Sequence, residues 1–527
     1  MMVLRSVWSL LLLLPLSFFP AAAQQPHPTP SPTPERPAKP AADEKPKPVA
    51  DEKKEPKDLL DQPPIVTHHE IHAGGKSLRY TATTGMMPIR NAENEVEGHI
   101  FFIAYTLDGQ SSEKRPLTFS FNGGPGSASV WLHLGAIGPK RVRMQPDGMM
   151  PAPPYQLVDN EFTWLDQTDL VFIDPVGTGY SRAAKSSLKA KFLGVREDIR
   201  SVGEFIRLYL GRHERWSSPL FLVGESYGTT RAAGLSGYLV EHGIAFNGIM
   251  LISSVLNFQT LDPRPGNDLP YVLFLPSFAT TAWYHKKVGP DLQQDFEKLR
   301  GEVEQWASTG YAEALAKGDR LTPEERSAVI DRLARYTGLR KTYIDQANLR
   351  VDEPHFTKEL LRDQKRTVGR LDSRFTGVDR RVIAETTSFD PSMTAIRPPY
   401  TAMFNQYVRT ELGYKSDMEY YILGGGFGFN EWDWGSASNG FADTAQALSD
   451  AFEKNPFMKL FVASGFYDLA TPYFATQYTL NHMGLDATQH GRISLGYYPA
   501  GHMMYIQDES LSTLRKDIGA FINNSLK

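Results

Sequence analysis

Residues 220–228 read Leu220-Phe221-Leu222-Val223-Gly224-Glu225-Ser226-Tyr227-Gly228. The apolar run over 220–223 predicts a buried strand, and the residues from Thr229 onward have a helical pattern. Gly-x-Ser-x-Gly between a strand and a helix is typical of a nucleophile elbow, a sharp turn that exposes the serine hydroxyl above the sheet edge. This context predicts that Ser226 is a nucleophile. The alternative is a loop serine between small residues.

Further apolar runs predict a sheet on both sides of this stretch. Short β-like runs cover residues 77–81 and 99–103, buried strands are expected at residues 116–121, 170–173, 249–253 and 457–463, and helices at residues 195–210 and 510–522. Strands that alternate with helices predict the α/β class, with a mostly parallel central sheet and helices on both faces.

The pattern changes between residues 259 and 421, where the strand signal fades and long charged helical stretches appear. Thr322-Pro323-Glu324-Glu325 has the form of a capping box at the start of such a helix. Insertions at strand ends commonly shape substrate sites. We therefore expect a helical cap insertion over residues 259–421, between the two parts of a catalytic domain, residues 65–258 and 422–527.

The N-terminal residues have the pattern of a secretory signal peptide. Arg5 precedes an apolar run to about Phe19, and Ala21-Ala22-Ala23 provides a small-residue cleavage site. The run is shorter than the ~20 residues of a membrane span, and an uncleaved anchor is the alternative. Residues 24–64 are rich in Pro, Lys and Glu and predict a disordered linker. We expect cleavage after Ala23 and a secreted or periplasmic mature chain without a stable membrane span.

Composition excludes several classes of function. Among 527 residues, 56 Lys and Arg against 60 Asp and Glu leave a net charge of −4, which does not favour binding to nucleic acid. The chain has no cysteine, which excludes disulfides, thiolate metal sites and a cysteine nucleophile.

A serine nucleophile needs a base and an acid, which in this class of fold follow it in the order acid, then histidine. Asp468 follows the predicted strand at 457–463, and its side chain is expected at the same sheet edge as Ser226. His502 lies in the small-residue loop before the last predicted helix. We expect His502 to accept the proton of Ser226 and Asp468 to orient the imidazole. Rival residues of the same types, without this loop context, are His482, His490 and Asp486.

A second glycine-rich loop follows the predicted strand at 116–121 and reads Asn122-Gly123-Gly124-Pro125-Gly126-Ser127. Main-chain N–H groups of such a loop can stabilise the oxyanion of a tetrahedral intermediate. No Lys-Ser or Lys-Thr pair follows, so a phosphate-binding loop is not favoured. We expect this loop to form an oxyanion hole together with the N–H of Tyr227.

These motifs resemble the serine carboxypeptidase family, the relatives of carboxypeptidase Y. Several motifs in the family's order are more specific than a single Gly-x-Ser-x-Gly. The similar segments are Asn122-Gly123-Gly124-Pro125-Gly126, Gly138-Pro139, Asp174-Pro175-Val176-Gly177-Thr178-Gly179-Tyr180-Ser181, Gly224-Glu225-Ser226-Tyr227-Gly228, Asp468 and Gly501-His502-Met503.

The resemblance implies an α/β-hydrolase fold with a helical cap, and an enzyme that removes C-terminal residues from peptides without a cofactor or a metal ion. It implies a catalytic triad of Ser226, Asp468 and His502. The oxyanion hole would be formed by the N–H groups of Gly124 and Tyr227.

The resemblance also implies a site for the terminal carboxylate of the substrate, formed by Asn122, the N–H of Gly123 and Glu225. Two carboxylates repel each other unless one carries a proton. A protonated Glu225 could donate to the substrate, which would favour cleavage at acid pH.

The sequence departs from the family at a few positions. The family usually has a second glutamate two residues before its Gly-Pro, and here that position is Ala136. Glu225 is therefore expected to lack a carboxyl partner, which affects carboxylate recognition and not the covalent chemistry. The cysteine common after the glycine-rich loop is Ser127, and Thr229-Thr230 replaces a frequent Ala-Gly.

Two other clusters have a structural and a functional interpretation. His68, Glu70 and His72 would share one face of a strand, and an exposed strand edge is favoured over a metal site. Trp432 and Trp434 could line a substrate pocket, although core packing is the more common role of tryptophan.

The leading hypothesis is a secreted serine-type carboxypeptidase that cleaves peptides with a free C-terminus through an acyl-enzyme on Ser226. The alternatives are an esterase, acyltransferase or aminopeptidase with the same triad, because a fold does not determine its substrate. A third hypothesis is a non-catalytic extracytoplasmic binding protein. The sequence leaves the oligomeric state open.

Overall fold

The computed structural model describes residues 62–424, 427, 431–435 and 440–527. All of these residues belong to one unit, Glu55–Lys527. The predicted signal peptide and the predicted linker up to residue 61 lie outside the described residues.

Among the described residues, ten strands form one sheet, in the order β1-β2-β3-β7-β4-β9-β10-β13-β14, with β8 paired to β3. The pairs from β7 to β14 are parallel, whereas β1, β2, β3 and β7 pair antiparallel. The strands of the sheet are β1 (Ile65–Ala73), β2 (Lys76–Arg90), β3 (Val96–Leu107), β4 (Leu117–Phe121), β7 (Asp169–Asp174), β8 (Arg182–Ala183), β9 (Leu220–Ser226), β10 (Gly248–Ser254), β13 (Lys459–Gly465) and β14 (Ile493–Tyr498).

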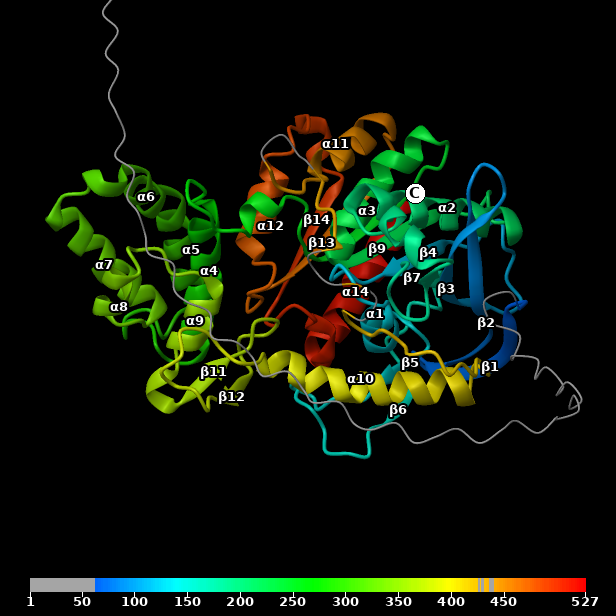
Figure 1. The fold of residues 1–527 in the computed structure, drawn as a ribbon, viewed down its shortest axis with the longest axis horizontal. Helices are drawn as coiled ribbons and strands as arrows, with labels where there is room; N and C mark the ends of the chain where they lie inside the picture. Colours follow the sequence, from blue (N-terminus) through cyan, green and yellow to red (C-terminus); the bar gives the residue numbers. More distant parts are fainter. Residues whose placement is uncertain (1–61, 425–426, 428–430, 436–439) are drawn as a thin grey trace, which may run out of the picture. The chain divides into compact units, whose positions relative to one another are not determined.

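Helices cover both faces of this sheet (Figure 1). Alternate residues of each strand point to opposite faces, so Phe101 and Ile103 contribute to one core and Phe102 and Ala104 to the other. The first core is closed by α1 (Val130–Leu132), α10 (Pro391–Thr410) and α14 (Asp508–Ser525), and the second by α2 (Val195–Arg212), α3 (Tyr227–Glu241) and α11 (Ala445–Lys454). The predicted α/β class with a mostly parallel sheet is confirmed.

The predicted insertion at 259–421 is largely helical, and most of it has a hydrophobic core of its own. Its last helix, α10, differs, because its buried side chains pack in the core of the sheet. The helices before α10 are α4 (Leu269–Tyr284), α5 (Phe296–Trp306), α6 (Ala312–Lys317), α7 (Pro323–Thr337), α8 (Lys341–Gln346) and α9 (Glu353–Glu359). We propose that residues 259–421 form one insertion, made of this helical part and a part that packs on the sheet.

Short elements complete the described chain. A capping box on Thr322 and Glu325 begins α7 at the predicted position. The predicted strand at 457–463 instead begins at Lys459, because Phe457 is exposed and Asn455 forms a turn before the strand. The remaining elements are β5 (Lys140–Val142), β6 (Leu157–Asp159), β11 (Arg366–Val368), β12 (Thr376–Val378), α12 (Tyr473–Asn481) and α13 (Ala487–His490), with short helical turns between them. None of the helices in the described part of the chain combines the length and the apolar character needed to span a bilayer.

Candidate active site

Ser226 lies at a sharp turn between β9 and α3. It is the last residue of β9, and α3 begins at Tyr227. Its backbone has φ of 59° and ψ of −131°, a conformation that costs a residue with a side chain of the order of 1–3 kcal/mol. Such strain persists only where the surrounding structure imposes it, and here it leaves the serine half-buried at the carboxyl end of a central parallel strand.

The glycine-rich loop lies directly against this turn. A Cβ atom at Gly123 would come within 2.6 Å of the main-chain N of Gly228 and 2.7 Å of the main-chain O of Glu225. Only glycine allows the two backbones this close. The structure therefore places the predicted oxyanion residues, Gly124 and Tyr227, on two segments in main-chain contact.

Asp468 and His502 form a buried pair. Nδ1 of His502 donates to Oδ2 of Asp468 over 2.7 Å, and the two residues are 4% and 0% exposed. The carboxylate also accepts hydrogen bonds from the N–H of Ala470 (2.7 Å), the N–H of Thr471 (3.0 Å) and the hydroxyl of Thr471 (2.7 Å). Four donors fix this carboxylate. The carboxylate in turn fixes the imidazole tautomer in which Nδ1 carries the proton and Nε2 carries none.

His502 is also held through its main chain. Its N–H donates to the oxygen of Leu371, and its carbonyl accepts from the hydroxyl of Ser253, each over 2.6 Å. Burial lowers the pKa of His502, but the Asp468 carboxylate and Glu225 outweigh this, so the pKa lies above its usual value. Leu371 belongs to the predicted insertion, which thus contributes to the position of the histidine.

Glu225 is buried and directly precedes Ser226. Burial raises its pKa to about 7, and the nearby His502, Tyr505 and Asn122 oppose this shift only in part. Oε2 accepts a hydrogen bond from the hydroxyl of Tyr505. Ala136 has no carboxyl group to pair with Glu225. A hydrogen-bond partner of Glu225 is instead this tyrosine from another segment.

Asn122 faces the same carboxyl group. Its Oδ1 accepts from the N–H of Leu132 over 3.0 Å, and its buried amide group faces Glu225 and Tyr505, where a hydrogen bond from Asn122 lowers the pKa of both. Asn122, Glu225 and Tyr505 thus form one buried polar cluster next to the serine turn.

The sequence analysis missed three residues that support this arrangement. Arg231 on α3 pairs with Asp198 on α2 over 2.8 Å and donates to the main-chain oxygen of Asn122 over 2.7 Å. Thr471 donates to Asp468, as described above. Arg231 and Thr471 lie within a few residues after a recognised motif, whereas Asp198 has no such signal.

The segment at 174–181 stabilises the glycine-rich loop. Oδ1 of Asp174 accepts from both the N–H and the hydroxyl of Ser129, each over 2.8 Å. Ser181 donates to the main-chain oxygen of Asp174 over 2.5 Å. This motif thus holds the residues that follow the glycine-rich loop, and we assign it no reacting group.

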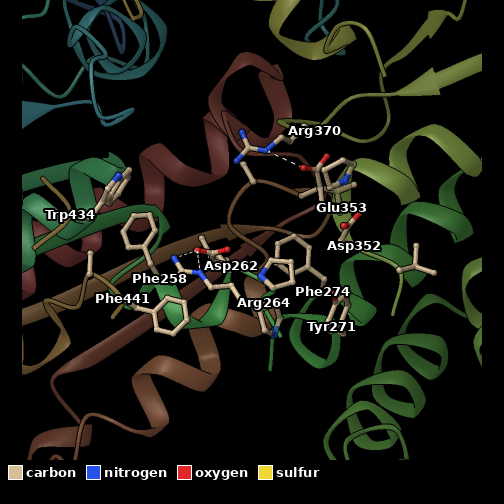
Figure 2. Close-up of a pocket in the computed structure, with 18 of the residues that line it drawn as sticks. Phe258, Asp262, Arg264, Tyr271, Phe274, Asp352, Glu353, Arg370, Trp434 and Phe441 are labelled. Carbon is tan, nitrogen blue, oxygen red and sulfur yellow. Dashed lines mark hydrogen bonds and ion pairs between the residues drawn. The ribbon is translucent and has the colours of Figure 1, made fainter. Parts of the chain in front are cut away.

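A cavity of about 610 Å³ adjoins the site (Figure 2). Leu469 and Ala470, directly after Asp468, form part of its wall, and Phe258 and Trp434 connect it to Tyr227, on whose ring both pack. The predicted insertion contributes further apolar lining residues, among them Leu261, Tyr271 and Phe274.

The charged side chains of this cavity are paired. Asp262 accepts from Nε of Arg264 over 2.8 Å, and Arg370 lies 3.4 Å from Glu353. Burial raises the pKa of Glu353 to about 7, which weakens its negative charge at neutral pH. The cavity therefore offers mainly apolar and aromatic surface to a ligand.

The rival site residues lie elsewhere. His482 follows α12 and bonds to the main chain of Tyr478, His490 bonds to the main chain of Leu485, and Asp486 caps α13. These contacts explain the three side chains without a catalytic role.

The two remaining clusters also have structural explanations. His68, Glu70 and His72 are exposed on β1, at the edge of the sheet. Trp434 lines the cavity, whereas Trp432 is buried against Phe427 and Tyr227. In the described part of the chain, no group of three or more His, Asp or Glu is placed to hold a metal ion.

Comparison with known proteins finds similarity to the family that the motifs resemble. Residues 75–274 match the family model described as serine carboxypeptidase. Serine carboxypeptidase-like 2 of Arabidopsis thaliana is 29% identical over 154 residues, which cover 28% of this chain and 32% of that protein. Serine carboxypeptidase-like 13 of the same plant is 27% identical over 175 residues, 31% of this chain and 38% of that protein. The chain thus spans about a third of the length of the curated relatives it matches.

A solved structure extends the likeness to most of the chain. Kex1(delta)p, a prohormone-processing carboxypeptidase from Saccharomyces cerevisiae, matches with a TM-score of 0.51 at 16% identity and covers 84% of this chain and 91% of that one. At this identity the match shows the fold. The predicted α/β-hydrolase fold and the predicted resemblance to the serine carboxypeptidase family are confirmed. The family match includes Ser226 and the glycine-rich loop, whereas Asp468 and His502 lie beyond it.

Proposed function

We propose that this protein is a serine-type carboxypeptidase that cleaves the last peptide bond of substrates with a free C-terminal carboxylate. The observation that carries the proposal is the buried pair of Glu225 and Asn122 beside the nucleophile. An acid that remains protonated up to about neutral pH, with a buried amide hydrogen-bonded to it, suits a carboxylate ligand, whereas simple ester hydrolysis needs neither group.

We propose a catalytic cycle in which Ser226, His502 and Asp468 act as a triad. Oγ of Ser226 attacks the carbonyl carbon while Nε2 of His502 accepts its proton, and Asp468 stabilises the imidazolium that forms. The N–H groups of Gly124 and Tyr227 stabilise the oxyanion. His502 then protonates the leaving amine, and water hydrolyses the acyl-enzyme by the reverse sequence of proton transfers.

The cavity accommodates the acyl side of the substrate. The residues proposed to bind the terminal carboxylate, Asn122, Gly123 and Glu225, are absent from its lining. A substrate whose terminal carboxylate lies at Glu225 therefore has its preceding residues outside the carboxylate site. The cavity is the space that adjoins this site. We infer that these residues are preferentially large and apolar.

The N-terminal sequence supports a place of action outside the cytoplasm. Residues 1–23 have the composition of a signal peptide, and the chain needs no disulfide because it has no cysteine. We propose that the mature protein is secreted or periplasmic, which N-terminal sequencing of the protein from a culture fraction tests directly.

A pair of matched substrates tests the proposed activity. Hydrolysis of a blocked dipeptide with a free C-terminus is compared with hydrolysis of its C-terminal amide and of a simple ester, with Ser226→Ala as the control for the triad. A strong preference for the free acid that increases at acid pH supports a carboxypeptidase. Equal cleavage of acid and amide, or cleavage of the ester alone, would refute the proposal in favour of an esterase or acyltransferase.

A further inference from the structure

Tyr505 is a fully buried residue in the segment that follows the proposed catalytic histidine. It lies three positions after His502, in a short 3-10 turn, Met504–Ile506. Its hydroxyl donates a hydrogen bond to Oε2 of Glu225, a residue 280 positions earlier in the sequence. This bond connects the histidine segment to the serine turn.

Small residues make room for the tyrosine ring. A Cβ atom at Gly135 would lie 2.5 Å from Cε2 of Tyr505 and 2.7 Å from the hydroxyl of Tyr400. The next residue, Ala136, is fully buried and has only a methyl side chain. The ring of Tyr505 therefore occupies space that a larger residue at 135 would fill, and it reaches Glu225 through that space.

The hydroxyl of Tyr505 keeps its proton and can donate a hydrogen bond to Glu225. Burial and the neighbouring Glu225 raise the pKa of Tyr505 well above its usual value, so the phenol keeps its proton throughout the range in which peptidases work. Where the phenol donates to Oε2 as the carbonyl oxygen, the proton of the neutral carboxyl group lies on Oε1.

We propose that Tyr505 is a positioning residue for substrate recognition: it orients the Glu225 carboxyl group so that Oε1 donates to the terminal carboxylate of a peptide. The amide of Asn122 belongs to the same buried cluster, because it bonds to Glu225 and Tyr505, and it would supply a second donor to the same carboxylate. This inference rests on the proposed carboxypeptidase function and adds a residue that the family motifs do not contain.

Tyr505→Phe tests the proposal, because it removes the hydroxyl and keeps the ring. At about pH 5, Glu225 is protonated in either protein, since its pKa is about 7. We expect the variant to lose about tenfold in kcat/KM for the free-acid dipeptide, chiefly through KM, and to keep the value for the amide. The ratio of acid to amide cleavage is the decisive readout.

Tyr311→Phe is the matched control. Tyr311 is also buried, and its hydroxyl donates to the main-chain oxygen of Leu349 over 2.6 Å in the predicted insertion. This variant should leave the acid-to-amide ratio at the wild-type value. If Tyr505→Phe also keeps that ratio, or loses both activities equally, Tyr505 has only a structural role and the proposal is wrong.

A binding measurement separates this proposal from the proposed activity. Calorimetry compares the dissociation constants of the acid and the amide dipeptide for Ser226→Ala with and without Tyr505→Phe, and needs no turnover. A preference for the acid that falls about tenfold in the double variant supports the role of Tyr505, even if the wild type hydrolyses neither substrate. An unchanged preference overturns it. If Tyr505→Phe does not fold, Gly135→Ala provides the same measurement, because its Cβ displaces the ring.

Discussion

Arg231 donates a hydrogen bond from Nη1 to the main-chain oxygen of Asn122 over 2.7 Å, and both residues are buried. The same guanidinium pairs with Asp198, so α2 and α3 together fix the first residue of the glycine-rich loop. The position of the proposed oxyanion donors therefore depends on a buried ion pair.

Arg231→Met should reduce both stability and turnover. The substitution leaves the carboxylate of Asp198 buried without its cation, which costs about 3–5 kcal/mol in the free energy of unfolding. The loop also loses a donor to the Asn122 carbonyl, so we expect kcat per folded molecule to fall by about 10²-fold. Denaturant unfolding and active-site titration with a fluorophosphonate separate the two effects.

Arg215→Met is the control for this prediction. Arg215 is also a buried arginine, paired with Asp169 over 2.7 Å, at the amino end of β7 and thus far from the carboxyl ends of the strands that carry the site. It should lower stability and leave kcat per folded molecule unchanged. Full turnover in folded Arg231→Met would contradict the role assigned to the pair.

Gly123→Ala should abolish activity. The added Cβ would come within 2.6 Å of the main-chain N of Gly228, and neither backbone can move without disturbing the serine turn. Gly301→Ala is the control, because a Cβ there meets no atom within 4 Å and the residue lies within α5. It should keep full activity and gain up to about 1 kcal/mol in the free energy of unfolding. Equal activities of the two variants would contradict the proposed loop contact.

Two substitutions of different severity test how Asp468 and Thr471 hold His502 in position. Asp468→Asn should lower kcat about 10⁴-fold, since the amide favours the wrong imidazole tautomer. Thr471→Val keeps the shape of the side chain and removes one of the four hydrogen bonds to the carboxylate, so we expect a loss of at most about tenfold. Steady-state kinetics with the amide substrate measure both, and a larger loss in Thr471→Val would mean that its contact with Nδ1 of His502, at 3.2 Å, matters more than its bond to Asp468.

Much of the fold follows from local sequence patterns. The strand predicted at 249–253 is β10, Gly248–Ser254, and the helix predicted at 195–210 is α2, Val195–Arg212. Buried parallel strands and amphipathic helices have periodicities that a single sequence displays. The strand at 457–463 begins later than predicted, because an apolar residue such as Phe457 can also lie exposed in a turn.

The sequence predicted only part of the candidate site, because only part of it depends on residue types that form a recognisable motif. Ser226 and the glycine-rich loop have motifs because their backbone conformations require particular residues. The partners Arg231 and Tyr505 have none, since a buried hydrogen bond between distant segments leaves no spacing pattern. Only the folded chain shows that Tyr505 reaches Glu225.

The pH dependence should differ between free-acid and amide substrates. Glu225 has a pKa of about 7, and the groups that face it are His502, Tyr505, Asp468 and Asn122. As pH rises through about 7, Glu225 becomes an anion and repels the substrate carboxylate, so kcat/KM for the free acid should fall. The pKa of His502 is raised and its neutral form is the proposed base, so hydrolysis of the amide should rise as pH increases and His502 loses its proton.

Glu225→Gln separates these two titrations. Glutamine stays neutral, so the fall at high pH for the free acid should disappear while the rising limb remains. Profiles of kcat/KM against pH for both substrates provide the measurement. Identical profiles for acid and amide in the wild type would exclude Glu225 from carboxylate recognition.

Trp434→Ala should change specificity and leave the chemistry intact. Trp434 lines the cavity next to Phe258, with ring centroids 4.9 Å apart, and it contacts Tyr227 beside the nucleophile. For dipeptides with phenylalanine on the acyl side, we expect kcat/KM to fall by about tenfold to a hundredfold, because the side chain loses apolar contact. A dipeptide with alanine in this position makes little apolar contact with Trp434, so its kcat/KM should change little. Trp216→Ala is the control, since Trp216 is exposed on the surface. Equal losses for phenylalanine and alanine substrates would show that Trp434 supports the serine turn and that the acyl side of the substrate lies outside this cavity.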